Sequence, residues 1–241
     1  MKILKYNNNN LATDSFGRGR TCTTSKRFSR HDDSFFFRPH IDITNKLISN
    51  EKSILIKSND GNTQEHQVYI ISLAVKNNTR FWSKIGNNCF YKIFLSKDNE
   101  GIIEEPYELC WKTRLPNECK TDKKENFIDC YRKELEQFVK TKTYLLRGID
   151  KELLFLLTIP SSDSVYLIGV KNGEKLNESG NIIGNFEYIE FIKLEIGEYN
   201  VNLVFHSDEY KESKGANYKL NIKGWNSIEF TKIKFYRNYK N

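Results

Sequence analysis

The residue types best suited to chemistry in this chain are an aspartate and a Glu-x-Lys run downstream of it. Asp98 precedes Glu118-Cys119-Lys120. In magnesium-dependent nucleases two carboxylates hold the metal ion and a lysine assists the attacking water, so the three groups must converge at strand ends. Asp98, Glu118 and Lys120 are therefore candidate catalytic residues, with Mg²⁺ as the cofactor. Charged residues make up 29% of the chain, so one such match is also expected by chance.

A second polar group, His206-Ser207-Asp208-Glu209, follows a β-like run and places a base beside carboxylates. Acid–base chemistry or metal binding is one interpretation, and a strand end with solvated charges is the favoured one. Glycine-rich phosphate loops and the G-x-S-x-G elbow are absent. The five cysteines form no CxxC pair, which argues against a zinc site and for reduced thiols. Outside the nuclease hypothesis, no cofactor is expected.

Charge points to a polyanionic partner. The chain has a formal net charge of +7 and a pI near 9.0, which attracts nucleic acid, although plain solubility is the simpler explanation. Residues 1–38 carry many cations among polar residues and few apolar side chains, which predicts a flexible basic arm that neutralises phosphates, or an ordinary frayed terminus. The arm residues predicted to contact DNA are Arg18, Arg20, Lys26, Arg27 and Arg30.

The elements that must position these groups are mostly strands. Short apolar or alternating runs, rich in β-branched and aromatic residues, are punctuated by turn residues. Asn172-Gly173 is the strongest hairpin signal, because both residues tolerate positive φ. The predicted strands are 54–57, 67–75, 89–96, 107–114, 153–159, 165–170, 186–196, 199–205, 218–222 and 227–236.

One segment favours a helix. Asp122 and Glu125 have capping-box spacing, and an apolar stripe then recurs at steps of three and four. The stripe consists of Ile128, Tyr131, Leu135 and Phe138, and predicts an amphipathic helix over 122–141, ending near Lys142.

The segment 56–70 carries the most distinctive motif, Ser58-Asn59-Asp60-Gly61 followed by Thr63 and then His66-Gln67. It resembles the start of the effector-binding domain of EcoRII-like restriction endonucleases, a pseudo-barrel related to the DNA-binding domain of plant B-three transcription factors. The resemblance spans residues 54–171, with Gln64-Glu65 where the family usually has Gly-Gly. It implies recognition of duplex DNA in the major groove. The contacts that it implies are Ser58, Asn59, Asp60, Thr63, His66 and Lys124. A favoured turn followed by a strand is the competing interpretation of the same residues.

Taken together, these features predict a mainly β (α+β) protein with pseudo-barrel-like strands, one amphipathic helix and a C-terminal β meander. The expected organisation is a basic arm (1–38), a β-rich DNA-recognition domain (39–172) and a β-strand extension (173–241). The leading hypothesis is a sequence-specific double-stranded DNA-binding protein of restriction-modification type. The alternatives are a Mg²⁺-dependent type II restriction endonuclease and a basic-armed viral coat protein. Without an apolar span or a signal-peptide pattern, a cytoplasmic protein with no membrane contact is expected. A homodimer is one option.

Overall fold

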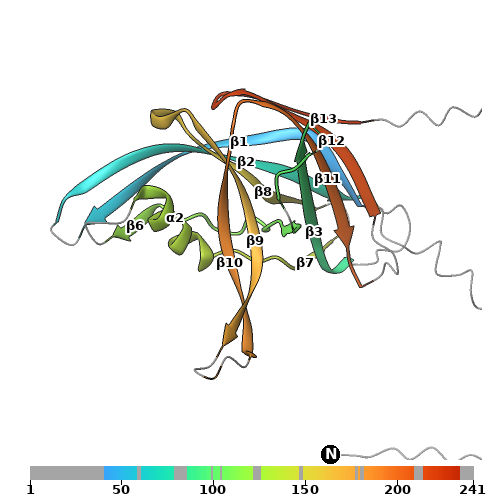
Figure 1. Cartoon of the computed structure of the whole chain (residues 1–241), viewed down its shortest axis with the longest axis horizontal. Coiled ribbons are helices and arrows are strands. Elements are labelled where there is room, and N and C mark those ends of the chain that lie inside the picture. Colours follow the sequence, from blue (N-terminus) through green and yellow to red (C-terminus); the bar gives the residue numbers. More distant parts are fainter. Residues whose placement is uncertain are drawn as a thin grey trace, which may run out of the picture.

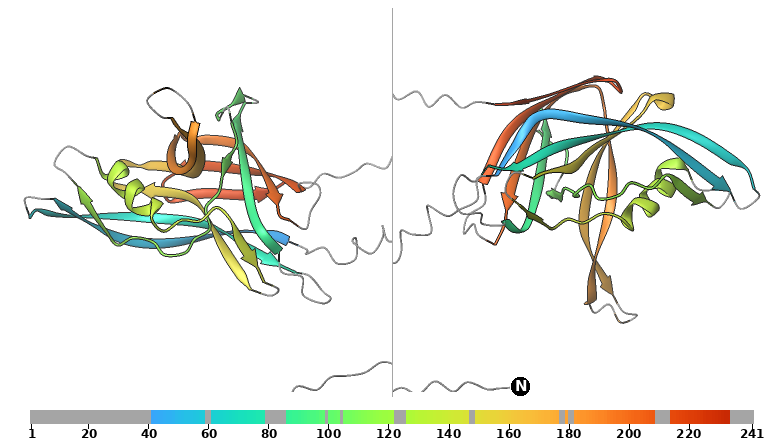
Figure 2. Two further views of the ribbon diagram at one scale, coloured as in Figure 1. Left: turned by 90° about the horizontal axis from the view of Figure 1, so that it is seen from below. Right: turned by 180° about the vertical axis from the view of Figure 1, so that it is seen from behind.

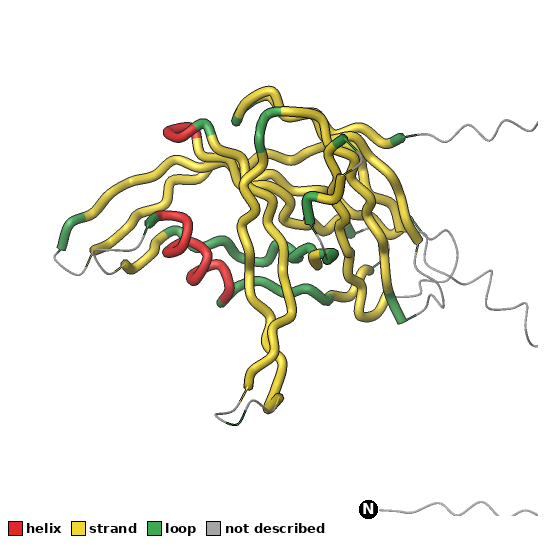
Figure 3. The backbone as a smooth tube through the Cα atoms, viewed as in Figure 1, coloured by secondary structure: helices red, strands yellow, loops and turns green. Residues whose placement is uncertain are grey.

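The computed structural model describes residues 41–58, 61–78, 86–98, 100–103, 105–121, 126–146, 149–176, 179, 182–208 and 214–233. Most of these residues belong to strands, as Figures 1 and 3 show. The strands are β1 (Ile41–Ser58), β2 (Thr63–Asn77), β3 (Gly86–Lys97), β4 (Glu100–Gly101), β5 (Tyr107–Glu108), β6 (Glu118–Thr121), β7 (Thr143–Leu145), β8 (Asp150–Ile159), β9 (Ser164–Leu176), β10 (Ile182–Leu194), β11 (Gly197–His206), β12 (Lys214–Gly224) and β13 (Ser227–Lys232). The helical elements are α2 (Phe127–Glu136) and a short 3₁₀ turn, η1 (Pro160–Ser162).

The strands form one large, strongly curved sheet with the order β13-β12-β11-β3-β5-β9-β8-β2-β1-β6. Its pairings are antiparallel except for the parallel pairing of β1 with β6. The sheet arches over α2, and the described strands do not close into a barrel (Figure 1). The predicted mainly β fold with one amphipathic helix is therefore confirmed. The C-terminal meander is present as β11-β12-β13, whereas β10 pairs with β9.

Strands with only one face toward the core show alternating apolar and polar residues. In β11 the side chains of Tyr199, Val201, Leu203 and Phe205 are buried, while the residues between them are exposed or half-buried. Residues 68–75 of β2 and 153–159 of β8 are instead nearly continuous apolar runs, because both faces of the sheet are covered there. Two apolar clusters result, one enclosed by β3, β11 and β12 and the other between the sheet and α2.

The predicted turn at Asn172-Gly173 is wrong. Both residues lie inside β9, and Gly173 is paired with Phe186 of β10. A Cβ on Gly173 would lie 2.6 Å from the Phe186 ring, so this glycine serves the close approach of a ring and not a turn. Consequently β9 and β10 continue as a two-stranded ribbon that projects beyond the rest of the sheet (Figures 1 and 2).

The predicted helix over 122–141 is too long. Its N-cap is Asn126, whose side chain accepts the Asp129 N–H at 2.9 Å, and the expected capping pair Asp122 and Glu125 lies outside the described residues. After Glu136 the chain leaves the helix, because Lys140 offers its carbonyl to Trp111 in a β-bridge. Tertiary pairing therefore ends the helix before its apolar pattern ends.

The division at residue 172 or 173 is not reflected in the sheet. β9 runs through both residues, and β11 pairs with β3 over Asn200–His206. The predicted recognition domain and C-terminal extension thus share one sheet and one apolar cluster. The predicted basic arm lies outside the described residues.

Candidate nucleic-acid interface

The β1–β2 hairpin carries the segment that the sequence singled out. Ser58 ends β1 and Thr63 begins β2; the Ser58 N–H donates to the Asn62 carbonyl, and the Gly61 N–H donates to the Ser58 carbonyl, both at 2.9 Å. Gly61 has φ +86°, a left-handed conformation that favours glycine. The hairpin presents an exposed Thr63 and a half-buried Ser58 at its tip.

His66 lies on the face of this hairpin that covers α2. Its ring stacks on Phe127, the first residue of the helix, with centroids 4.7 Å apart and an interplanar angle of 7°. Phe127 in turn stacks on the buried Tyr131 at 5.8 Å. His66, the histidine of the motif, is thus the first of three stacked rings that pack the hairpin against the helix; we refer to these rings as the ladder.

A cleft of about 420 Å³ opens beside this ladder. It lies between β2, the start of α2 and η1, and so combines three segments that are far apart in the sequence. We refer to it as the ring cleft, and its lining residues are His66, Asn126, Phe127, Ile128, Ile159, Ser161, Ser162 and Tyr166.

Cations gather along the outer edge of the same hairpin. We define the cationic edge as Lys52 and Lys57 of β1, Lys112 and Arg114 of the segment leading to β6, and Lys120 of β6. The Leu55 N–H donates to Asn117 at 2.9 Å, and the parallel pairing with β6 places Lys57 opposite Lys120. Long-range pairing therefore brings these cations to one edge of the sheet, where Lys52 and Lys57, five positions apart on β1, project from opposite faces.

Only part of this charge is neutralised. Lys57 pairs with Glu118 at 2.7 Å and Lys112 with Glu152 at 2.6 Å. Lys52 donates to the carbonyl of Leu115 at 2.7 Å. Within the described parts of the chain, Lys52, Arg114 and Lys120 have no carboxylate partner.

Burial, followed by repulsion from Lys112 and Arg114, lowers the pKa of Lys52 below its ordinary value. A lowered pKa means that the folded protein disfavours the charged form of Lys52. An anion bound beside these cations would offset the repulsion among them.

The predicted catalytic trio does not converge. Asp98 is an exposed residue with φ +52° directly after β3, whereas Glu118 and Lys120 lie on β6. The strands β5, β9, β8, β2 and β1 separate β3 from β6 in the sheet, and the two lie on opposite sides of Figure 1. Glu118 instead pairs with Lys57. The Glu-x-Lys spacing is therefore part of an edge strand, and these three residues cannot share a metal ion.

The side chain of His206 packs against a neighbouring aromatic ring. Its ring stacks on Phe90 at 4.7 Å and 6°, and burial, followed by the charge of Lys92, lowers its pKa. The neighbouring Asp208 accepts a hydrogen bond from Asn88 at 2.7 Å, and Glu209 lies outside the described residues. The favoured strand-end interpretation agrees with this arrangement.

Several predicted contacts lie outside the described residues: Arg18, Arg20, Lys26, Arg27, Arg30, Asn59, Asp60 and Lys124. Among the described ones, Ser58, Thr63 and His66 share one hairpin. Sequence reasoning missed Lys52, Lys57, Lys112 and Arg114, because a parallel pairing between distant segments leaves no local pattern.

The described cysteines Cys89, Cys110, Cys119 and Cys130 are buried free thiols. Burial, with smaller contributions from Glu187 and Glu108, raises the pKa of Cys110 to about 12. A thiol with so high a pKa is a poor nucleophile, so Cys110 acts in packing.

Across the described ranges, no group of three or more His, Cys, Asp or Glu side chains is arranged to hold a metal ion. No helix in the described part of the chain has the length and apolar character required to cross a membrane. Comparison of the sequence and structure with protein-family models, curated proteins and solved structures yields no match.

Proposed function

We propose that this protein binds double-stranded DNA through the cationic edge and the tip of the β1–β2 hairpin. The observation that carries the proposal is the convergence of Lys52, Lys112 and Arg114: burial first, and then repulsion from the other two cations, lowers the pKa of Lys52. Phosphate groups placed along this edge would offset the repulsion and release counterions, which is the main source of affinity for duplexes.

Two further features support the proposal. The chain has a formal net charge of +7. The residues that resemble the DNA-contacting loop of EcoRII-like effector domains, Ser58, Thr63 and His66, belong to the same hairpin as Lys57. Hydroxyl side chains at such a tip can bind phosphates or base edges, so we assign sequence reading to the tip and positioning to the cationic edge. We retain a restriction-type system as the biological setting on the strength of that resemblance alone.

An edge strand rich in lysine has another use, since charges oppose unwanted pairing with a second sheet. The two roles predict different behaviour. A protective edge needs only charge and gives no saturable complex, whereas a DNA interface gives binding that falls steeply with salt.

The test is fluorescence anisotropy of labelled duplexes titrated with the full chain at several salt concentrations. Arg114→Gln should weaken binding and reduce the slope of log K against log salt by about 1, as loss of one phosphate contact does. Lys232→Gln is the matched control, because Lys232 is an exposed lysine on β13 at the other end of the sheet. It should leave the slope of the wild-type protein unchanged.

Sequence preference is tested by selection from a random duplex library. Enrichment of a common site, lost in Thr63→Ala, is expected. Absence of binding at low salt, or equal effects of Arg114→Gln and Lys232→Gln, would refute the interface.

A further inference from the structure

We infer that the ring cleft accepts one nucleobase, turned out of the duplex that the cationic edge binds. This inference rests on the proposed function and deepens it, because it names the part of the nucleic acid that enters the protein. Four observations carry it: the aromatic walls, the volume, the polar groups at the rim and the position beside the edge.

The walls are suited to a flat, aromatic ligand. One face of His66 lies against Phe127 at an interplanar angle of 7°, and Tyr166 and Ile159 form another part of the lining. Bases stack on aromatic side chains irrespective of their sequence, since each base has a π-face. The volume of about 420 Å³ lies within the range of about 300–1,000 Å³ typical of small-ligand sites.

The rim supplies hydrogen-bonding groups for the edge of a base. Ser161 and Ser162 are exposed residues of η1, and their hydroxyl groups can both donate and accept. Phe127 and Ile128 are the first residues of α2, where backbone amides have no acceptor within the helix. The amide of Asn126 has its oxygen on the Asp129 N–H, which leaves its nitrogen as a donor.

The cleft lies where an extruded base would arrive. His66 of β2 is paired with Ile54 of β1, and Lys52 precedes Ile54 by two residues and so projects from the same face of the sheet. A phosphate held at Lys52 and Arg114 would therefore lie on the side of the hairpin from which the cleft opens. Turning a base out of the stack is the means by which proteins reach a base inside a duplex.

The experiment uses duplexes in which single bases are replaced, one position at a time, by fluorescent 2-aminopurine. Stacking in the duplex quenches this base, so extrusion should raise its emission by about twofold or more at one position when the full-length protein binds. Ser161→Phe, on the exposed η1 turn, should fill the cleft and abolish the rise while anisotropy still reports binding of the same duplex. Thr231→Phe, at an exposed position of β13, adds the same ring elsewhere and should keep the rise.

The outcomes separate the two proposals. Salt-dependent binding with unchanged emission at every position would overturn the inference and leave the proposed function standing. A rise that persists in Ser161→Phe would place the extruded base elsewhere and would also overturn it. Failure of any duplex to bind would overturn both. A free 2-aminopurine nucleotide is the last arm: if it binds the cleft while duplexes give no rise, the site serves free nucleotides and the inference is wrong.

Discussion

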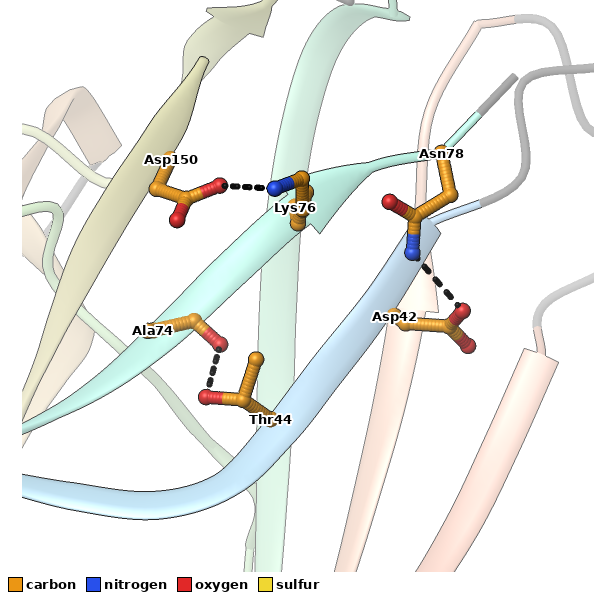
Figure 4. Close-up of polar contacts among 6 residues, drawn as sticks. All are labelled: Asp42, Thr44, Ala74, Lys76, Asn78 and Asp150. Atoms are coloured by element: carbon orange, nitrogen blue, oxygen red, sulfur yellow. Dashed lines mark hydrogen bonds and ion pairs between the residues drawn. The ribbon is translucent and has the colours of Figure 1, made fainter. Parts of the chain in front are cut away.

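The two ends of the β1–β2 hairpin have different surroundings. At the open end, charged groups are matched: Lys76 meets Asp150 at 3.5 Å and Asn78 donates to Asp42 at 3.2 Å. The Thr44 hydroxyl donates to the Ala74 carbonyl beside the β1 bulge, as Figure 4 shows. At the tip end, the cationic edge gathers like charges above α2.

The contrast teaches that matched and gathered charges act in opposite directions on the stability of one pair of strands. Matched pairs at the open end contribute to holding β1, β2 and β8 together. In the tip half, burial of Lys52 and then its repulsion by Lys112 and Arg114 lower its pKa, so this charged group opposes the folded state. A protein tolerates such an arrangement where burial elsewhere stabilises it, and here α2 buries Cys130, Tyr131 and Leu135 under the tip half.

The largest expected effect concerns the packing of α2 against the tip half of the hairpin. Leu135→Ala should lower the free energy of unfolding by about 2–5 kcal/mol, because Leu135 is 1% exposed and its removal leaves a cavity. Urea denaturation measures the change, and hydrogen exchange should show greater loss of protection in β6 than in β11. Leu146→Ala is the control, since Leu146 is 41% exposed and should change stability by about 0.5 kcal/mol at most. Equal costs would contradict a supporting role for the helix.

The turn at the tip gives the next effect. Gly61→Ala should cost about 1–2 kcal/mol, because φ is +86° and the space around the glycine is open, so that only backbone strain opposes the new methyl group. Gly184→Ala also meets nothing within 4 Å but has no positive φ, and should be neutral or stabilising. Thermal and urea unfolding compare the two, and a similar cost for both variants would remove the conformational explanation.

Charge substitutions at the open end and at the tip end of the hairpin should change the stability of the protein in opposite directions. Asp150→Asn leaves Lys76 without its partner and should destabilise by up to about 1 kcal/mol, the range of exposed ion pairs. Arg114→Gln removes a neighbour that repels Lys52 and should be neutral or slightly stabilising in the absence of DNA. Unfolding at low and high salt is the measurement, and the difference between the variants should shrink as salt screens both interactions. Destabilisation by Arg114→Gln would show that the cationic edge is a structural feature.

The smallest effect is the pH dependence contributed by Lys52. Its folded-state pKa lies below the ordinary value of 10.5, so the unfolded chain binds more protons between these two pKa values. Stability contributed by this group should therefore rise with pH across that window, by about 0.5 kcal/mol at most because Lys52 is partly exposed. The measurement is the free energy of unfolding as a function of pH. Subtracting the profile of Lys52→Gln from that of the wild-type protein isolates the contribution of Lys52, and Lys46→Gln on the same strand is the control. A difference that falls with rising pH would contradict the lowered pKa of Lys52.

How far the sequence predicts the structure depends on the range of the interactions involved. Alternation at Tyr199, Val201, Leu203 and Phe205 identifies β11 without any tertiary information. The apolar run 153–159 identifies β8 in the same way. Asn172-Gly173 misleads because its local preference for a turn is outweighed by the extended pairing of β9 with β10. The helix is identified but its end is not, because the Trp111–Lys140 bridge depends on a distant segment.

By itself the sequence determined the mainly β fold, the presence of one amphipathic helix and the basic character, since each follows from residue types and their periodicity over a few positions. Only the tertiary structure decided that Asp98 lies far from Glu118, that Arg114 is near enough to repel Lys52, and that His66 stacks on Phe127. Each of these depends on the register of strands paired across long loops, and register is set by the burial of a whole face of the sheet rather than by any local motif.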